Sequence, residues 1–177
     1  MMPRRSPARN TSCVTSVGRL CETGRVRVSA KSDYALRALI EIALRDDGAP
    51  VSAEALGRAQ DIPHGFLQAI LADLRKADVL VSVRGKSGGW RFARTPDRVT
   101  VADVIRAVDG PLVSVYGLRP EAVDYGENAE VLQHVWIAAR RSLREVFERV
   151  TIKQLADRSL PDEVAALTDD EDAWLPH

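Results

Sequence analysis

Cysteine is scarce in this chain of 177 residues, and both copies lie near its start. Cys13 and Cys21 have no other thiol and no histidine close by in the sequence. Such a pair is a poor metal site, and a disulfide between the two would be unusual in the cytosol. We therefore expect neither a metal centre nor a cofactor.

Long apolar runs are also missing. No segment approaches the roughly 20 consecutive apolar residues that a membrane-spanning helix needs. The N-terminal region lacks the apolar core of a secretory signal as well. We expect a soluble, cytoplasmic protein without a membrane partner.

The usual signatures of catalysis do not occur in the sequence, which pairs no nucleophile with a base and shows no metal-ligand spacing. Residues 85–87, Gly-Lys-Ser, resemble the end of a phosphate-binding loop. That loop needs a glycine five positions earlier, where this chain has Leu80, and a helix after the lysine, where it has Gly-Gly-Trp. We expect no enzymatic activity.

Charge is balanced in total but not along the chain. Residues 1–28 hold six basic side chains and one acidic, residues 29–100 hold eleven and nine, and residues 101–177 hold eight and fifteen, so the segment charges are +5, +2 and −7. Phosphate attracts the basic segments and repels the acidic one. Contact with nucleic acid is therefore expected within the first hundred residues.

Residues 1–27 are rich in Arg, Ser, Thr and Gly and have no apolar period, which predicts a disordered basic tail. The same composition is typical of an organellar transit peptide. A third interpretation is that the true start of the protein lies near Val26 or Val28, downstream of this tail.

The most informative stretch runs from Asp61 to Arg94. Four apolar residues spaced three and four apart predict one buried helix face, and Pro63 suits the first turn of that helix. These residues are Leu67, Ile70, Leu71 and Leu74, with His64, Gln68, Arg75 and Lys76 left for the outer surface.

A hairpin is predicted directly after this helix. Valines 79, 81 and 83 alternate with Leu80, Ser82 and Arg84, and a second alternating run opens with Trp90 and Phe92. Glycines 85, 88 and 89 tolerate positive φ in the loop between the two runs. The tip then carries Arg84 and Lys86.

Two further helices are predicted before this stretch. The first is capped by Ser32 or Asp33 and ends at Gly48 and Pro50, with Leu36, Leu39, Ile40 and Ala43 on its apolar face. The second is short, is capped by Ser52 and stapled by Val51 and Leu56, and reaches about Ala59. With the turn at residues 60–62 they make residues 28–110 a winged helix-turn-helix domain.

A basic hairpin beside an amphipathic helix suits duplex DNA, because the helix fits a major groove and a hairpin arginine can enter the minor groove. The alternative is an ordinary surface hairpin with a solvated charge.

The second half of the chain is predicted to hold two helices and a loop. Thr100 and Asp103 form a capping box for a helix that ends at residues 109–111, and residues 111–126 read as a loop. A dimerisation helix and its exit occupy residues 127–158, and residues 159–177 form an acidic tail. The helix carries a heptad-like stripe: Leu132, Trp136, Ala139, Leu143, Val146 and Val150. This stripe packs either on its own domain or, as we prefer, on a second copy of the chain. The expected fold class is mainly α with a small β-hairpin wing.

Three ordered motifs resemble the Rrf-two family of bacterial winged-helix regulators: L-x-x-L-R-K-A, then V-R-G-x-x-G-G-aromatic, then V-I-x-A-V-D-G-P. The resemblance spans about Ser29 to Ala156. It implies a homodimer on a pseudo-palindromic double-stranded operator, with Lys31 near phosphate, Gln68 reading bases and Arg84 in the minor groove. The full set of expected DNA contacts is Lys31, His64, Gly65, Phe66, Gln68, Arg75, Arg84, Lys86 and Ser87.

The sequence departs from the family in two places. Pro63, Gly65 and Phe66 stand where relatives often carry hydroxyl residues, so an operator sequence cannot be copied from them. Residues 112–134 contain none of the three cysteines that hold an iron–sulfur cluster in many members, which predicts a cluster-free protein. Asp124, Glu127, Glu130 and His134 could hold a hard divalent ion, but solvated charge at a helix start is the simpler explanation.

The sequence thus predicts a DNA-binding transcriptional regulator, with repression as the output that we favour. The alternative is a regulator controlled by a partner protein or a small-molecule effector at the dimer interface.

Overall fold

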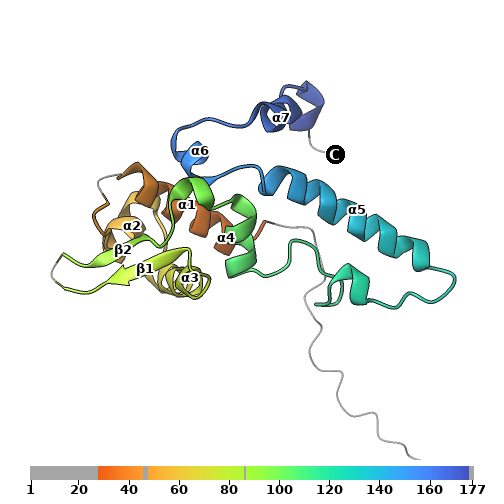
Figure 1. Ribbon diagram of the computed structural model, residues 1–177, viewed down its shortest axis with the longest axis horizontal. Helices are drawn as coiled ribbons and strands as arrows, with labels where there is room; N and C mark the ends of the chain where they lie inside the picture. Colours follow the sequence, from red (N-terminus) through yellow and green to blue (C-terminus); the bar gives the residue numbers. More distant parts are fainter. Residues whose placement is uncertain (1–27, 46–47, 86, 176–177) are drawn as a thin grey trace, which may run out of the picture.

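The computed structural model of the protein describes residues 28–45, 48–85 and 87–175 (Figure 1). The expectations for the basic tail, for the two cysteines and for Lys86 lie outside these residues.

Helices dominate the structure, and one two-stranded antiparallel hairpin accompanies them, as the sequence predicts (Figure 1). Helices α1, α2, α3, α4 and α6 pack together beside the hairpin, while α5 extends away from them (Figure 1). The helices are α1 (Ala30–Leu44), α2 (Ala53–Gln60), α3 (His64–Lys76), α4 (Val101–Val108), α5 (Glu130–Phe147), α6 (Ile152–Ala156) and α7 (Asp162–Ala165). The strands are β1 (Leu80–Val83) and β2 (Gly89–Phe92), and short 3-10 turns lie at η1 (Pro96–Arg98), η2 (Pro120–Ala122), η3 (Ala166–Thr168) and η4 (Glu171–Trp174).

Helix α1 begins three residues earlier than the sequence predicts. Its cap is Ser29, whose hydroxyl accepts a hydrogen bond from the Ser32 amide at 2.9 Å. Ser32 was expected to cap the helix, but it is fully buried, and its hydroxyl donates to Asp109 at 2.5 Å. The predicted cap at Ser32 or Asp33 is therefore wrong, because Ser32 lies on the buried face of the first turn.

The apolar face of α1 also differs from the prediction. Of the residues expected there, only Leu39 is fully buried, and Leu36 and Ala43 pack at the edge of the core. The small side chains at Ala35 and Ala38 allow other helices to approach α1 closely, so the buried face is set by alanines that a search for large apolar residues passes over. The buried apolar face consists of Ala35, Ala38, Leu39 and Ile42.

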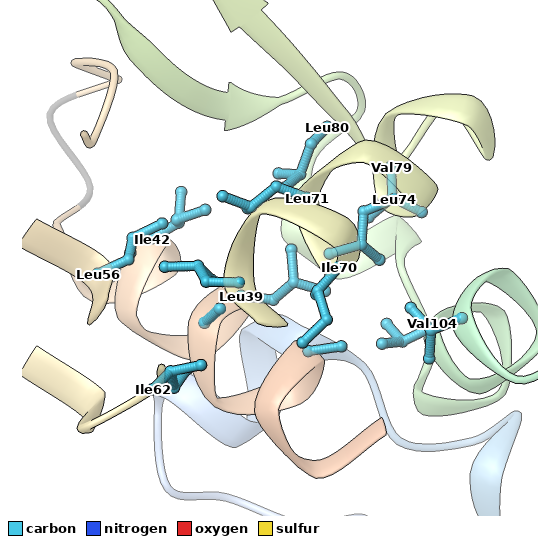
Figure 2. Packing of buried hydrophobic residues seen from close by; sticks show 14 of the residues in the cluster. Leu39, Ile42, Leu56, Ile62, Ile70, Leu71, Leu74, Val79, Leu80 and Val104 are labelled. Carbon is cyan, nitrogen blue, oxygen red and sulfur yellow. The ribbon is translucent and has the colours of Figure 1, made fainter. Parts of the chain in front are cut away.

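Helices α2 and α3 match the sequence closely. The Ser52 hydroxyl caps α2 by accepting from the Ala55 amide at 3.2 Å. Asp61 takes a left-handed conformation with φ of 49°, which turns the chain toward Pro63 and the start of α3. The four residues predicted for the buried face of α3 are all fully buried in the main core. Figure 2 labels three of them, Ile70, Leu71 and Leu74.

The hairpin pairs Leu80 with Phe92 and Val83 with Gly89. Its second strand also bridges to Val51, just before the cap of α2, since the Trp90 amide donates to the Val51 carbonyl at 2.8 Å and the Val51 amide donates to the Trp90 carbonyl at 2.9 Å. This bridge fixes the hairpin, near its loop end, to the helix-turn-helix.

Two local expectations for the hairpin need correction. Val79 and Leu80 were assigned to opposite faces, but both are buried, because Val79 lies before the strand and packs in the core. Gly88 does not take a positive φ, whereas Gly85 does, with φ of 114°. A Cβ at Gly89 would lie 2.4 Å from the Val51 carbonyl oxygen, so close backbone approach explains the absence of a side chain there.

Helix α4 starts at the predicted capping box, with Thr100 and Asp103 exchanging hydrogen bonds of 3.1 and 3.2 Å. A second capping box at Thr151 and Gln154 opens α6. The two caps lie side by side, because Val101 and Ile152 donate across to the carbonyls of Val150 and Val99. The chain therefore returns from α5 into the core, where Ile152 is fully buried.

The C-terminal residues, expected to form a solvated acidic tail, include one buried anchor. Val164 in α7 packs in a second apolar cluster with Val101, Ile105 and Val150. Residues 169–172 are exposed. Within the described residues, no helix combines the length and the apolar character that crossing a bilayer requires.

Candidate nucleic-acid interface

Helix α3 separates its two faces sharply. Its leucines and isoleucine face the core, whereas the opposite side leaves polar and small residues in solvent. The exposed residues are His64, Gly65, Phe66, Gln68, Ala69, Arg75 and Lys76. Five of the expected DNA contacts therefore lie on the exposed face of one helix.

Phe66 stands out on this face because it is apolar and 56% exposed. Tyr34 of α1 supports its ring edge-on, with ring centroids 6.3 Å apart and planes at 71°. The Arg37 guanidinium lies 5.6 Å from the centre of the Tyr34 ring. The first turn of α3 therefore presents an aromatic side chain that α1 braces from behind.

A polar network fixes the turn of the helix-turn-helix to α1. Arg37 donates to the Gln60 backbone carbonyl and, at 3.3 Å, to its side-chain oxygen. The side-chain amide of Gln60 donates to the Glu41 carboxylate at 3.0 Å, and Glu41 pairs with Arg45 at 2.7 Å. These bonds set where α2 ends, and therefore where α3 begins.

Lys31 occupies a different environment from the one that the resemblance implies. Its ammonium donates to Asp73 of α3 and to the Val108 carbonyl of α4, each at 2.7 Å. Lys31 and Lys76 hydrogen-bond to the Asp73 carboxyl and hold its pKa below the usual range. Lys31 thus joins three helices beneath the exposed face of α3, and its contact with phosphate stays a prediction.

The hairpin carries its exposed cations along one side and at its tip. Arg84 and Ser87 are exposed in the loop, as the sequence predicts. Arg91, opposite Val81 in the register, is also exposed and makes no ion pair among the residues that the structure describes. Arg91 is not among the DNA contacts predicted from the sequence, although its position between Trp90 and Phe92 in an alternating strand indicates an outward side chain.

Known proteins share this arrangement. A sequence profile of the Rrf2 family, described as iron-dependent transcriptional regulator, matches residues 28–158. The chain belongs to the Rrf2 family. As a member of it, the protein is a DNA-binding transcriptional regulator and not an enzyme.

Relatives and solved structures of the Rrf2 family align with most of the chain. A protein of Mycobacterium tuberculosis named as an HTH-type transcriptional regulator is 40% identical over 145 residues, which cover 82% of this chain and 90% of the relative. CymR of Bacillus subtilis is 30% identical over 131 residues, which cover 74% of this chain and 90% of CymR. Its structure, that of a protein described as the global cysteine regulator, superposes with a TM-score of 0.63 at 28% identity and covers 75% of this chain and 98% of CymR. The structure of IscR of T. potens superposes with a TM-score of 0.61 at 27% identity and covers 84% of this chain and 96% of IscR.

The family description names iron, but the donor chemistry of this chain does not fit an iron–sulfur cluster. Cysteine thiolates hold such clusters, and no cysteine follows Cys21. Within the described ranges, no group of three His, Cys, Asp or Glu side chains is arranged to hold a metal ion. Asp124, one of the carboxylates considered for a divalent ion, accepts from the Gly126 amide at 2.9 Å instead.

Helix α5 begins at Glu130, three residues later than predicted, and ends at Phe147. None of its described residues is fully buried. Trp136, Ala139, Leu143 and Val146 of the predicted stripe are half-buried, whereas Leu132 is 40% exposed. Val150 needs correction as a dimer residue, because it lies beyond the helix and is buried in the second cluster of its own chain.

The most exposed apolar residues of α5 lie next to this stripe near the start of the helix. Val131 is 67% exposed and Val135 is 52% exposed. They are four residues apart, so they lie on one face together with Leu132 at its edge. Neither valine belongs to the single heptad register from which the stripe was predicted.

Proposed function

We propose that this Rrf2-family protein acts as a homodimer that binds a pseudo-palindromic operator in the cytoplasm and represses transcription without an iron–sulfur cluster. The observation that carries the proposal is the pairing of the exposed face of α3 with the exposed arginines of the hairpin. The bridge between Val51 and Trp90 joins the hairpin to the start of α2, which packs against α3, and β1 contacts α3 directly.

Helix α3 is the recognition helix of this proposal. The recognition helix of a helix-turn-helix places its N-terminal residues against base edges in the major groove. His64, Phe66 and Gln68 occupy that end and are exposed. Gln68 can pair bidentately with adenine, and the Phe66 ring offers an apolar contact for a thymine methyl group.

The β1–β2 hairpin is the wing. Arg84 suits a narrow minor groove, where the negative potential is enhanced. Arg91, on the second strand of the wing, is placed to contact the adjoining DNA backbone. Arg75 at the end of α3 and Ser87 in the wing loop complete the set as phosphate contacts, together with Lys31 and Lys86 from the resemblance.

Dimerisation through α5 provides the symmetry that a palindromic operator requires, because two copies of the recognition helix must meet two half-sites. The exposed valines and Leu132 on α5 form the apolar patch that supports this proposal. Packing two such helices against each other would remove the patch from water and stabilise the dimer.

The experiment that tests the function is recovery of genomic DNA bound to the purified protein, followed by alignment of the bound sites. The proposal predicts one enriched sequence with two-fold symmetry, and a reporter placed behind it should be repressed by the protein. Bound fragments without a shared sequence would contradict the proposal.

The cluster-free state has its own test. Protein purified without oxygen should be colourless, should contain no stoichiometric iron or sulfide, and should bind the operator without added metal. Stoichiometric iron with visible absorption would contradict this part of the proposal and leave DNA binding intact.

A second candidate is control by a small ligand or partner protein beside α5. One specific observation favours it, a cavity lined by charged residues where the α4–α5 loop meets α5.

A further inference from the structure

A cavity of about 450 Å³ lies where α4, the loop after it and α5 come together. Its walls include Gly110, Pro111 and Leu112 from the start of the loop. Gln133 of α5 holds the same loop by donating to the carbonyls of Pro120 and Val123, at 3.1 and 3.2 Å. The walls therefore come from three segments that are fixed to one another.

Arginine dominates the lining of this cavity. Four arginines line it, Arg106 on α4, Arg119 in the loop, and Arg140 and Arg144 on α5, together with one acidic residue, Glu121. The surrounding second half of the chain is acidic overall, with fifteen acidic and eight basic residues from position 101 onward. Four arginines at one cavity in an acidic region form a local basic site.

Ion pairs within the protein do not balance these charges. Arg140 pairs with Glu121 at 2.6 Å, whereas Arg106 and Arg144 share one carboxylate, that of Glu148, the latter at 2.9 Å. Arg106 reaches Asp103 only at 3.9 Å, and Asp103 also pairs with Arg94 at 3.1 Å. Arg119 makes no salt bridge within the described part of the chain, so an excess of positive charge remains.

The geometry suits an anion of more than one charge. Guanidinium groups bind carboxylate and phosphate oxygens through paired, charge-assisted hydrogen bonds. A cavity of this size falls in the range of roughly 300 to 1,000 Å³ that holds small ligands. The side chains of Arg140 and Arg144 are 25% and 53% exposed, so they are accessible to a ligand without unfolding.

The cavity is also connected to the DNA-binding face. Its rim at Gly110 follows Asp109, which accepts from the buried Ser32 hydroxyl at 2.5 Å. The preceding carbonyl, of Val108, accepts from Lys31, which in turn binds Asp73 on α3. A ligand that moves the end of α4 would therefore act on a helix bonded to the recognition helix.

We infer that this arginine-lined cavity binds a small metabolite bearing at least two negative charges, as polycarboxylate or as phosphate. Its role as an effector site rests on the proposed function, but binding itself does not require DNA. A bound oxyanion would bridge α4, which packs in the DNA-binding unit, and α5, the proposed dimer helix.

Calorimetric titration of the full-length protein without DNA tests this inference. Citrate serves as the polycarboxylate probe, pyrophosphate as the phosphate probe, and acetate as the singly charged control. Saturable binding of citrate or pyrophosphate, one per chain and stronger than that of acetate, is expected. The stronger of the two identifies the ligand class.

Variants then place the bound anion. The double substitution Arg119→Gln with Arg144→Gln should weaken binding by at least about tenfold, because two charge-assisted contacts are lost. Arg141→Gln, on the same helix but outside the cavity and 81% exposed, is the matched control and should bind like wild type. Melting curves of each variant check that the fold is unchanged.

Three results would overturn the inference. They are the absence of saturable binding by either probe, equal binding by the double variant, and loss of binding in Arg84→Ala, which would place the anion on the wing. Operator affinity measured without any probe gives a fourth result that would overturn the inference. If the double variant binds the operator more weakly and with less salt dependence than wild type, the arginines contact the DNA backbone instead of a metabolite.

The regulatory role has a separate readout. Addition of the bound probe should change operator affinity in wild type and not in the double variant. An unchanged affinity contradicts the effector role, whereas failure of wild type to bind any operator at all contradicts the proposed function instead.

Discussion

Helices α3 and α5 carry similar apolar stripes but differ in how far the chain covers them. All four stripe residues of α3 are fully buried, whereas no residue of α5 is buried and two of its valines are more than half exposed. Burial of apolar surface is the main favourable term in folding and association. The comparison indicates that the apolar face of α3 is covered by its own chain, whereas the apolar face of α5 is left for a partner to cover.

The largest expected effect lies on α3. Leu71→Ala removes a fully buried side chain and should lower the free energy of unfolding by about 2 to 5 kcal/mol, since a cavity remains. Val131→Ala on α5, measured by the same denaturant titration at a concentration where the protein is monomeric, should change it by less than about 0.5 kcal/mol. Equal losses would remove the distinction between the two helices.

On α5, Val135→Glu tests association directly. An isolated chain tolerates a charge at this half-exposed position, but a dimer interface would bury it without a partner, which is strongly unfavourable. Light scattering should show a dimer for wild type and a monomer for the variant, with unchanged helix content by circular dichroism. Leu143→Glu should act in the same way if the half-buried stripe shares the interface. A dimer that survives both changes would place the contact elsewhere.

A smaller effect is expected near the loop end of the wing, where β2 contacts Val51. Gly89→Ala places a Cβ 2.4 Å from the Val51 carbonyl oxygen, so the bridge between Val51 and Trp90 must shift, at a cost of about 1 to 3 kcal/mol. Gly65→Ala, where a Cβ meets nothing within 4 Å, is the matched control. Thermal melting of both variants measures the difference in stability, and an equal Tm would show that the contact between β2 and Val51 is adaptable.

The smallest predicted effect depends on pH. Hydrogen bonds from Lys31 and Lys76 lower the pKa of Asp73 in the folded state, so its contribution to stability is present above the unfolded pKa and is lost as pH falls through the folded pKa. Asp73→Asn should therefore cost about 1 kcal/mol at neutral pH and progressively less in acid. A constant difference across the acid range would contradict this role for Asp73.

Local periodicity was enough to predict α3 and its buried face, because Leu67 through Leu74 repeat at helical spacing within one window. It failed for α1, where alanines rather than large residues meet the core, and Ser32 is buried instead of capping. Elements as short as α6 and α7 offer no period to detect. Their places in the core depend on contacts between residues distant in sequence, such as those of Ile152 with Val99 and of Val164 with Val101.

The part of the candidate DNA-binding site that lies on α3 and the wing could be predicted from the sequence. Gln68 and Arg84 follow from their positions in those two elements, and both are exposed. Arg91 was missed although its strand was predicted. The arginine cavity could not be predicted at all, since Arg106, Arg119 and Arg140 come together only through the tertiary fold.

The most direct test of the central claim is operator affinity of wild type, Gln68→Ala and Arg84→Ala across several salt concentrations and single-base operator changes. Gln68→Ala should relax preference at one position in each half-site by about 1 to 3 kcal/mol and leave non-specific binding nearly unchanged. Arg84→Ala should weaken binding to every sequence and reduce the salt slope by about 0.9, which corresponds to one lost phosphate neutralisation. Arg141→Ala on α5 is the control that should match wild type. If Arg84→Ala binds like wild type at every salt concentration, the hairpin is not a DNA-binding wing and the account is contradicted.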